Sequence, residues 1–583
     1  MTSVRSMKTW SSGVERFFSE NGEWLSRGAF WLTAVLLVAA AAYWTAMLWM
    51  QVHRVLLFDD AYMFFRYAVN MRSGLGISWN PDGIPTYGET SQLWGLVVLV
   101  LSFLPVSMSS ALVVGSWLCS VGAVGAISWA VAKNACSAYM SSAWRVAPMV
   151  AVPLLLTRCY LPNSVNGMET MLGVLLGGWF VGLALGWAEG RVRPQAVGGM
   201  GVLFFLVRPE AALAVSTMVL LLQFLRPAAS IRARSWRETL TVVSIVGGGI
   251  AFYLGLCQTY FHSALPLSFY VKSQHGYEGY AQRWLPFSNA VGVLAACRPF
   301  LLLMALFARR AHGWMVACCL VPALLTFAYL LTVTQIMGLD SRYYVPYLGF
   351  FLVPGLLLLD RFVAAGIGSG SRGISRGAWV GHALAAAGVM LLFVPSRAHT
   401  AVLDYVDRKV ENRSQVYAPV ELTVVAAKAL PEADWFRTIT AMSDALVKPL
   451  PRGVTLAATE VGYLGAENPQ KTLIDLAGLN DAEIAHHGVS MNALLRRKPD
   501  IIWLPHPAYT YQRGVMLSDP ALLREYDVIA GAANYGLALR KDSPYRGQID
   551  RQMQVLWDDL YPGYSMSEYR VSAVSWTGQK TTG

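Results

Sequence analysis

Residues Gly28 to Met50 read GAFWLTAVLLVAAAAYWTAMLWM and carry no charge from one end to the other. A helix that crosses the hydrocarbon of a bilayer needs about 20 apolar residues. The segment before it is polar and basic, without a short apolar core followed by a small-residue cleavage site. We therefore expect an uncleaved signal anchor, with residues 1–27 in the cytoplasm.

The rest of the chain has the composition of a membrane protein. Of its 583 residues, 55% are hydrophobic and 14% are charged, whereas soluble chains carry roughly 25% charged residues. This composition excludes a disordered, fibrous or small disulfide-linked protein. It predicts a multi-pass protein of the inner (cytoplasmic) membrane, with the lipid bilayer as its surroundings.

The net charge of +11 does not point to nucleic acid. Basic residues cluster in short segments between apolar runs, as in cytoplasmic loops, where Lys and Arg resist translocation. No basic-aromatic module accompanies them, so we expect no nucleic-acid partner. The clusters are Arg191 and Arg193, then Arg226, Arg232, Arg234 and Arg237, then Arg309 and Arg310, and then Arg372 and Arg376.

Eleven further apolar runs follow the first. They are Leu93–Leu104, Ala111–Ala132, Val146–Thr157, Met168–Trp187, Ala196–Val207, Ala211–Leu225, Leu240–Phe261, Val293–Ala308, Gly313–Val333, Tyr343–Leu359 and Gly377–Val394. The basic loops place both Arg54–Ser91 and Cys159–Gly167 outside, and only an even number of crossings can join these segments. The shortest run, Leu93–Leu104, is therefore expected to be a half-span. The result is about 11 transmembrane helices within residues 28–395, with the C-terminus outside.

The tail, residues 396–583, is long enough to form a domain. Short apolar, β-rich runs alternate in it with helical patterns, which predicts a soluble extracytoplasmic α/β domain. The expected strands are Gly453–Ala458, Thr472–Ile474, Asp500–Leu504 and Tyr526–Ala530, and the expected helices include Pro419–Leu430 and Gln548–Leu556. The tail contains no cysteine, so disulfides do not hold it together.

Two adjacent acids, Asp59 and Asp60, come shortly after the first span. Helical periodicity follows them, and it places Asp59, Met63, Arg66 and Asn70 on one side of a helix. One interpretation is that one Asp caps this helix and the other pairs with Arg66. The other is that an acid at the lipid boundary has a raised pKa and acts as a general base.

Further charged residues lie where the chain enters or leaves the membrane. Glu89 is either an exposed interfacial acid, which we favour, or a substrate ligand. Glu169 begins an external helix, where a carboxylate favours the helix dipole, so it either caps this helix, which we favour, or binds substrate. Arg208 and Glu210 interrupt an apolar stretch, so they either pair with each other or bind a phosphate or hydroxyl group.

A third group of polar residues lies outside, beside the later runs. Tyr260–Gly276 carries His262, Tyr270, Lys272 and His275, and Gln335–Tyr344 carries Asp340, Arg342 and Tyr343. Lys and Arg beside the outer face of the membrane are contrary to the positive-inside rule, and they suggest an anionic partner such as a lipid phosphate. For Lys272 the alternative is that its side chain only extends to the membrane-water interface and binds no ligand.

The stretch Phe58 to Trp94, FDDAYMFFRYAVNMRSGLGISWNPDGIPTYGETSQLW, resembles the first periplasmic loop of GT-C-fold glycosyltransferases. It is most similar to the terminal β-(1→2)-arabinofuranosyltransferase family. Later pieces agree in the same order, although this chain has Ser91-Gln92 where that family suggests Asn-Pro. These pieces are 166–170 (NGMET), 207–210 (VRPE), 264–270 (ALPLSFY) with Lys272, 340–346 (DSRYYVP), 460–465 (EVGYLG) and 474–485 (IDLAGLNDAEIA).

The resemblance implies an inverting enzyme that uses a polyprenyl-phosphate sugar, such as an arabinofuranose donor, and an envelope glycan acceptor. It implies that the catalytic acid lies in loop 51–91 and is Asp59 or Asp60, of which the face shared with Arg66 favours Asp59. Some GT-C enzymes use a divalent metal, but nothing in this sequence requires one. The expected substrate-binding residues are Arg66, Glu89, Glu169, Arg208, Glu210, His262, Tyr270, Lys272, Arg342 and Tyr343.

Two other classes of protein compete with this interpretation. A lipid-linked-glycan exporter needs charged residues along an inner passage and often shows paired halves, whereas the ionisable groups here concentrate at one face. A non-catalytic assembly or regulatory protein, of the flagellar motor-control type, keeps the fold without needing Asp59 or Asp60.

Overall fold

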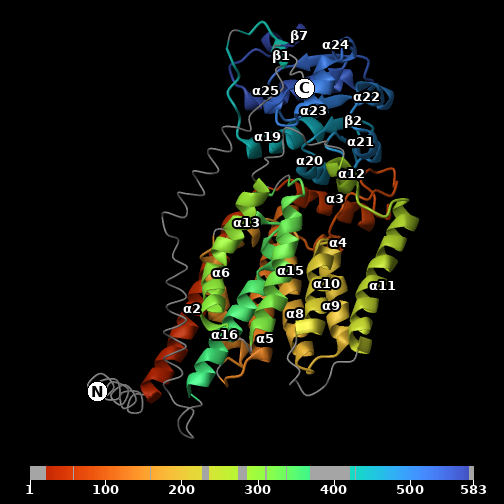
Figure 1. Cartoon of the computed structure of the whole chain (residues 1–583). Helices are drawn as coiled ribbons and strands as arrows, with labels where there is room; N and C mark the ends of the chain where they lie inside the picture. Colours follow the sequence, from red (N-terminus) through yellow and green to blue (C-terminus); the bar gives the residue numbers. More distant parts are fainter. Residues whose placement is uncertain are drawn as a thin grey trace.

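The chain forms a bundle of apolar helices with a tail above one end of it (Figure 1). The computed structural model describes residues 22–56, 58–138, 140–157, 159–225, 236–273, 285–308, 312–335, 338–367, 420–426 and 428–576. Several sequence predictions lie outside these residues. They concern the run Gly377–Val394, the basic residues Arg226, Arg232, Arg234, Arg309, Arg310, Arg372 and Arg376, and His275.

The apolar runs form the helices of the bundle. These are α2 (Gly22–Gln51), α4 (Gln92–Leu101), α5 (Met108–Asn134), α6 (Ala143–Leu155), α8 (Thr170–Ala188), α9 (Pro194–Val207), α10 (Ala211–Leu225), α11 (Trp236–Phe261), α13 (Leu285–Ala296), α14 (Arg298–Phe307), α15 (Gly313–Leu331) and α16 (Gly349–Ile367). Among the described residues, five helices are long and apolar enough to cross a membrane, and two bent pairs raise this to as many as seven. The protein is therefore a multi-pass membrane protein.

The two bent pairs each contain a proline close to the bend. Helices α13 and α14 meet at 58°, where Pro299 lies in the first turn of α14. The segment 339–347, which holds the short helices η2 (Leu339–Ser341) and η3 (Val345–Tyr347), meets α16 at 54°. Proline has no backbone N–H to donate to the preceding turn, which favours such a break.

Helix α4 is, together with α14, the shortest apolar helix of the bundle among the described residues. Its ten residues extend about 15 Å, or about half of the hydrocarbon thickness. Three other apolar helices, α6, α9 and α10, are also shorter than a full crossing usually requires. The count of 11 spans therefore stays a prediction.

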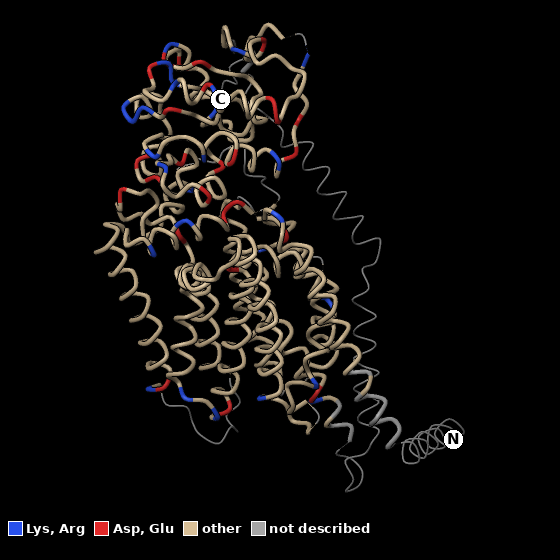
Figure 2. Tube along the Cα trace, turned by 180° about the vertical axis from the view of Figure 1, so that it is seen from behind, with Lys and Arg blue, Asp and Glu red and all other residues tan. Residues whose placement is uncertain are grey.

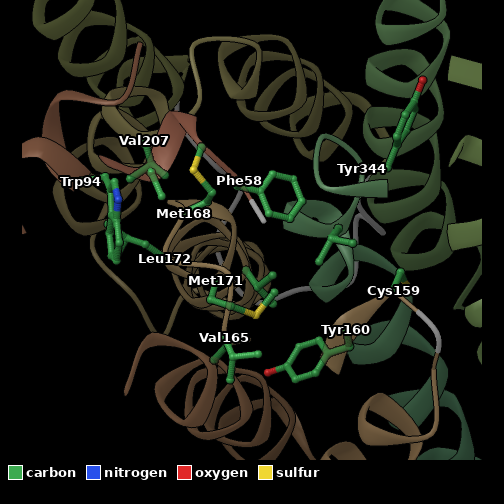
Figure 3. Packing of buried hydrophobic residues seen from close by; sticks show 14 of the residues in the cluster. Phe58, Trp94, Cys159, Tyr160, Val165, Met168, Met171, Leu172, Val207 and Tyr344 are labelled. Atoms are coloured by element: carbon green, nitrogen blue, oxygen red, sulfur yellow. The ribbon is translucent and has the colours of Figure 1, made fainter. Parts of the chain in front are cut away.

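Charge and packing both set the bundle apart from the tail. Charged residues lie in the tail, at its junction with the helices and at the opposite helix ends, while the helices between are almost uncharged (Figure 2). Below the junction the helices share a core of aromatic, sulfur-containing and aliphatic side chains (Figure 3). It includes Phe58, Trp94, Met168, Met171, Leu172 and Val207, all buried.

The tail is built around a five-stranded sheet of order β3-β2-β4-β6-β5. Strand β2 (Thr455–Ala458) is parallel to both β3 (Thr472–Asp475) and β4 (Ile501–Trp503). Strand β6 (Leu537–Arg540) is antiparallel to β4 and to β5 (Tyr526–Ile529). The helices around the sheet are α19 (Trp435–Ala441), α20 (Gly462–Glu467), α21 (Ala482–His487), α22 (Met491–Arg497), α23 (Thr510–Ser518), α24 (Ala521–Glu525) and α25 (Arg546–Leu560).

One element of the tail was wrongly predicted. The stretch Pro419–Leu430 was expected to be helical, but its described part begins with strand β1 (Val420–Thr423). This strand pairs antiparallel with β7 (Ala573–Trp576), so Val420 lies opposite Trp576. The partner is about 150 residues away in the sequence, and a local pattern cannot reveal it.

The tail is held to the membrane part by helix α3 (Asp60–Arg72), which packs against α20. A methyl group on Gly462, the first residue of α20, would overlap the main-chain oxygen of Asp59. A methyl group on Gly465 would lie 2.9 Å from Nη1 of Arg66. The two helices therefore approach closely because glycine faces α3 at both positions.

We predict that Gly462→Ala releases the tail from α3. The added methyl group has no space, and overpacking of this kind costs about 1–3 kcal/mol. Hydrogen exchange of the α3 and α20 amides should speed up, and the unfolding midpoint should fall. Gly547→Ala in α25, where a methyl group meets nothing within 4 Å, is the matched control. Unchanged α3 protection in Gly462→Ala would contradict this view of the junction.

Candidate functional site

A cavity of about 210 Å³ lies at the junction between the helices and the tail. The first loop, the helix ends around α8 to α10, the segment before α16 and the tail all contribute to its wall. Its charged lining residues are Asp59, Asp60, Glu89, Glu169, Arg208, Glu210, Lys272, Arg342 and Glu460. The structure thus brings together seven of the ten predicted substrate-binding residues, including Tyr343, with both predicted catalytic acids.

Asp59 joins the first loop to the tail. Its side chain is buried, and its two carboxylate oxygens accept hydrogen bonds from the backbone N–H groups of Gly462 (2.6 Å) and Tyr463 (2.8 Å). Burial raises the pKa of the Asp59 carboxyl to about 6, while the two amide donors oppose this rise. Asp59 occupies the N-cap position of α3 without capping the helix through its side chain.

Asp60 faces the cavity and forms an ion pair with Arg342. The distance from Arg342 Nη2 to Asp60 Oδ2 is 3.0 Å, and the Asp60 side chain is 22% exposed, compared with 5% for Arg342. Arg342 Nη2 also lies 3.2 Å from the Tyr343 hydroxyl, whereas its buried Nε and Nη1 have no hydrogen-bond partner among the described residues. Arg342 therefore holds Asp60 while leaving two donors for a ligand.

Arg66 does not lie on the cavity. It is fully buried and donates to the backbone oxygens of Trp79, Gly465 and Lys471 and to Asn80 Oδ1. Neither Asp59 nor Asp60 pairs with it, so the interpretation in which one Asp caps α3 and the other pairs with Arg66 was wrong. The predicted helix face exists, but Arg66 on this face contacts the tail and Asn70 contacts the loop segment after α3, at Ser78 and Trp79.

Arg208 forms the centre of a buried ionic group. Its Nη1 lies 3.4 Å from Glu169 Oε1 and 3.6 Å from Glu210 Oε1, so the predicted pairing with Glu210 occurs but is shared. Its Nη2 donates to the backbone oxygen of Arg342 at 3.0 Å. Glu169 stands at the N-cap position of α8 but its side chain makes no capping bond, contrary to the simpler interpretation. Its buried Oε2 has no hydrogen-bond partner in the described part of the chain.

Three cations surround the ring of Tyr343. The guanidinium carbons of Arg208 and Arg342 lie 5.0 Å and 5.1 Å from the ring centre, and Lys272 Nζ lies 5.8 Å from it. Cations within about 6 Å of an aromatic face are attracted by it. The ring thus gathers three positive charges on one wall of the cavity.

The burial of Glu89 differs from the sequence prediction. We favoured an exposed interfacial acid, but its side chain is buried and lines the cavity. The carboxyl group packs over Gly95, where an added methyl group would lie 2.6 Å from Oε2. Its Oε1 has no hydrogen-bond partner among the residues that the structure describes. Burial raises the pKa of Glu89 to about 8.

The tail contributes cavity residues that were not predicted from the sequence. Glu460 lies in the matched piece EVGYLG and lines the cavity, as does Asn480. Burial and the nearby Asp59, Asp60 and Asp475 raise the pKa of Glu460 to about 8. Asn480 receives a hydrogen bond from the Tyr67 hydroxyl at 2.9 Å and donates one to Asp475. In the sequence, Glu460 could have been singled out only as the acidic residue of the matched piece EVGYLG.

Two predicted ligands lie elsewhere. His262 is exposed, and neither it nor Tyr270 lines the cavity. The Tyr270 hydroxyl lies 3.2 Å from Ser263 Oγ, and its ring lies 4.3 Å from that of His486. Within the described ranges, no three His, Cys, Asp or Glu side chains are grouped so as to hold a metal ion.

Comparison with known proteins gives distant likenesses only. Residues 429–555, all in the tail, match a family described as a domain of unknown function (DUF8728), which covers too little of the chain to assign it to a family. No curated protein matches.

One similar solved structure is ArnT from Cupriavidus metallidurans bound to undecaprenyl phosphate. It is 13% identical, with a TM-score of 0.44 over 81% of this chain and 95% of that one. Another is the archaeal oligosaccharyltransferase AglB from Archaeoglobus fulgidus, in complex with an inhibitory peptide and a dolichol-phosphate. It is also 13% identical, with a TM-score of 0.42 over 88% of this chain and 75% of that one.

We predict that acid pH stabilises the protein. An acid whose pKa is raised on folding stabilises the fold while protonated, and this contribution is lost as pH rises through the raised pKa. For Glu460 the rise is from 4.5 to about 8, and for Asp475 from 3.8 to about 7. The unfolding midpoint in detergent should therefore be higher at pH 5.5 than at pH 8.

Glu460→Gln distinguishes the contribution of Glu460 to this pH dependence from that of the other acids, because the neutral amide resembles the protonated carboxyl. The substitution should raise the midpoint at pH 8 and leave it nearly unchanged at pH 5.5. Glu525→Gln, at an exposed position paired with Arg524, is the control. Equal effects of Glu460→Gln at both pH values would contradict a raised pKa.

Proposed function

We propose that this protein is an inverting glycosyltransferase of GT-C type. It transfers a sugar, arabinofuranose by the sequence resemblance, from a polyprenyl-phosphate donor to a cell-envelope glycan at the outer face of the cytoplasmic membrane. The observation that carries the proposal is the cavity in which Asp60, held by Arg342, faces the cations around Tyr343. The position of this cavity beside the helix ends supports a substrate with both a lipid and a sugar part.

The donor phosphate is assigned to Lys272 and Arg342. Lys272 has no hydrogen bond or ion pair with a described residue, although it lies 5.8 Å from the Tyr343 ring centre. Arg342 has two buried nitrogens without partners in the described ranges. Charge-assisted bonds to a phosphate would satisfy these groups. They would also stabilise the negative charge that develops on the leaving phosphate.

We propose Asp60 as the general base, in place of Asp59, which the shared helix face had favoured. Both oxygens of Asp59 are held by backbone amides of the tail, whereas Asp60 is partly exposed to the cavity and held through one oxygen. In the proposed reaction the acceptor hydroxyl oxygen bonds to the anomeric carbon and its proton passes to Asp60. The bond from that carbon to the phosphate oxygen breaks, and the phosphate leaves with the electron pair. Attack opposite the leaving group inverts the anomeric centre.

We predict different losses for the two acids in full-length protein in lipid nanodiscs. Asp60→Asn keeps an oxygen for Arg342 Nη2, so it should remain folded and lose a factor of about 10² to 10⁴ in transfer rate, as expected for a general base. Asp59→Asn keeps one acceptor for two backbone donors and should lower the unfolding midpoint. The assay measures transfer from a panel of polyprenyl-phosphate sugars to envelope glycan fragments.

Each outcome distinguishes the proposal from its rivals. Full transfer by Asp60→Asn shows that Asp60 is not the base. Movement of a lipid-linked glycan across the bilayer without transfer supports the exporter interpretation. If no donor is consumed and envelope glycans of a deletion strain are unchanged, the non-catalytic interpretation holds.

The phosphate assignment gives a further prediction. Lys272→Met removes a positive charge and should raise the donor KM about 10- to 100-fold, as expected for loss of a hydrogen bond to a charged group. Lys541→Met, at an exposed position of the tail, should leave the donor KM unchanged. An unchanged donor KM in Lys272→Met, with an altered acceptor KM, would move this residue to the acceptor.

A further inference from the structure

The tail presents the carboxyl ends of three parallel strands to the cavity. Strands β3, β2 and β4 lie side by side in that order and run in the same direction. The segment after each strand lines the cavity. These lining residues are Thr459 and Glu460 after β2, Ala477, Leu479 and Asn480 after β3, and Tyr509 after β4.

The order of these strands creates a reversal next to β2. The chain passes from β2 to β3 on one side and then returns to β4 on the other side of β2. In open α/β sheets, ligands bind in the crevice outside the carboxyl ends of strands at such a reversal. Glu460 and Tyr509 follow the two strands that flank it, so the crevice of the sheet opens into the cavity.

Glu460 is the carboxyl group at this crevice that the fold does not use. Asp475, at the end of β3, is fully buried and accepts hydrogen bonds from the backbone of Ala477 and from both nitrogens of Asn480. Glu460 is half-buried and has no hydrogen bond or ion pair with a residue in the described ranges. Its pKa of about 8 leaves it largely protonated at neutral pH, when it can both donate and accept a hydrogen bond.

The surroundings of Glu460 are rigid and suited to a sugar. Asn480 is fixed between Asp475 and the Tyr67 hydroxyl, and Tyr509 is buried at the crevice. Binding sites for small ligands combine apolar or aromatic walls with a few well-placed polar groups. A sugar ring offers hydroxyl groups to the carboxyl and apolar C–H groups to the aromatic ring.

We infer that the crevice after β2 and β4 is the subsite for the acceptor sugar, and that Glu460 hydrogen-bonds an acceptor hydroxyl beside Asp60. The inference rests on the proposed transferase function. It divides the cavity between two substrates, with the donor phosphate at Lys272 and Arg342 and the acceptor against the tail. Glu460 is then a residue that determines acceptor binding and is supplied by the tail.

The test combines kinetics and binding on the full chain in nanodiscs. Glu460→Ala should raise the acceptor KM roughly tenfold, as expected for one lost hydrogen bond, and leave the donor KM unchanged. Glu460→Gln, which can donate and accept like the protonated acid, should restore the acceptor KM to near wild type. Glu525→Gln on the tail surface should behave as wild type.

Binding without turnover keeps this inference separate from the proposed function. In an Asp60→Asn background, Glu460→Ala should weaken binding of envelope glycan fragments, measured by calorimetry, by the same factor. Wild-type transfer together with an unchanged acceptor KM in Glu460→Ala overturns the subsite while the transferase stands. A raised donor KM instead places Glu460 with the donor sugar and also overturns it. Absence of any transfer by the wild type, with fragment binding insensitive to Glu460, overturns both.

Discussion

The structure depends on two buried charges of one short segment, Asp59 and Arg66, being satisfied by the backbone of the tail. Asp59 takes two amide donors from the start of α20, and Arg66 donates to carbonyl oxygens at Gly465 and Lys471. A buried charge is costly unless it is paired or hydrogen-bonded. The first loop and the tail therefore stabilise each other, although about 400 residues separate them in the sequence.

This mutual dependence makes the cavity a composite. The helix ends supply Arg208, Glu169 and Glu210, the first loop supplies Asp60 and Glu89, and the tail supplies Glu460 and Asn480. None of the three parts encloses the site alone. Docking of the tail therefore completes the cavity by supplying one of its walls. The residues of this wall follow strands β2, β3 and β4, and the sheet behind them fixes their positions.

Local patterns were sufficient to predict much of the fold. The apolar runs, strands β2 to β5 of the tail and the helix face shared by Asp59, Met63, Arg66 and Asn70 follow from local patterns, because each depends on neighbours in the sequence. The segment that packs against this helix face could not be predicted from periodicity. Arg66 donates to backbone oxygens, and because every residue has one, no residue type in the sequence marks the partner. The pairing of β1 with β7 could not be predicted either, because it depends on a partner strand that is distant in the sequence.

The site prediction succeeded where charge alone was informative and failed where orientation mattered. Arg208, Lys272 and Arg342 lie far apart in the sequence, yet all three meet at Tyr343. Arg208 stood out as a charge that interrupts an apolar stretch, and Lys272 and Arg342 as cations contrary to the positive-inside bias. Arg208 is already shared between two glutamates, and Arg342 holds Asp60. Lys272 and the remaining nitrogens of Arg342 are therefore the groups that a bound anion can satisfy without breaking an existing pair. The described residues that line the cavity from the tail include no Lys or Arg, so the opposite wall offers no positive charge to a phosphate. This separation of charge gives the cavity a direction, with its anion-binding end at the cations and its hydroxyl-binding end at the tail.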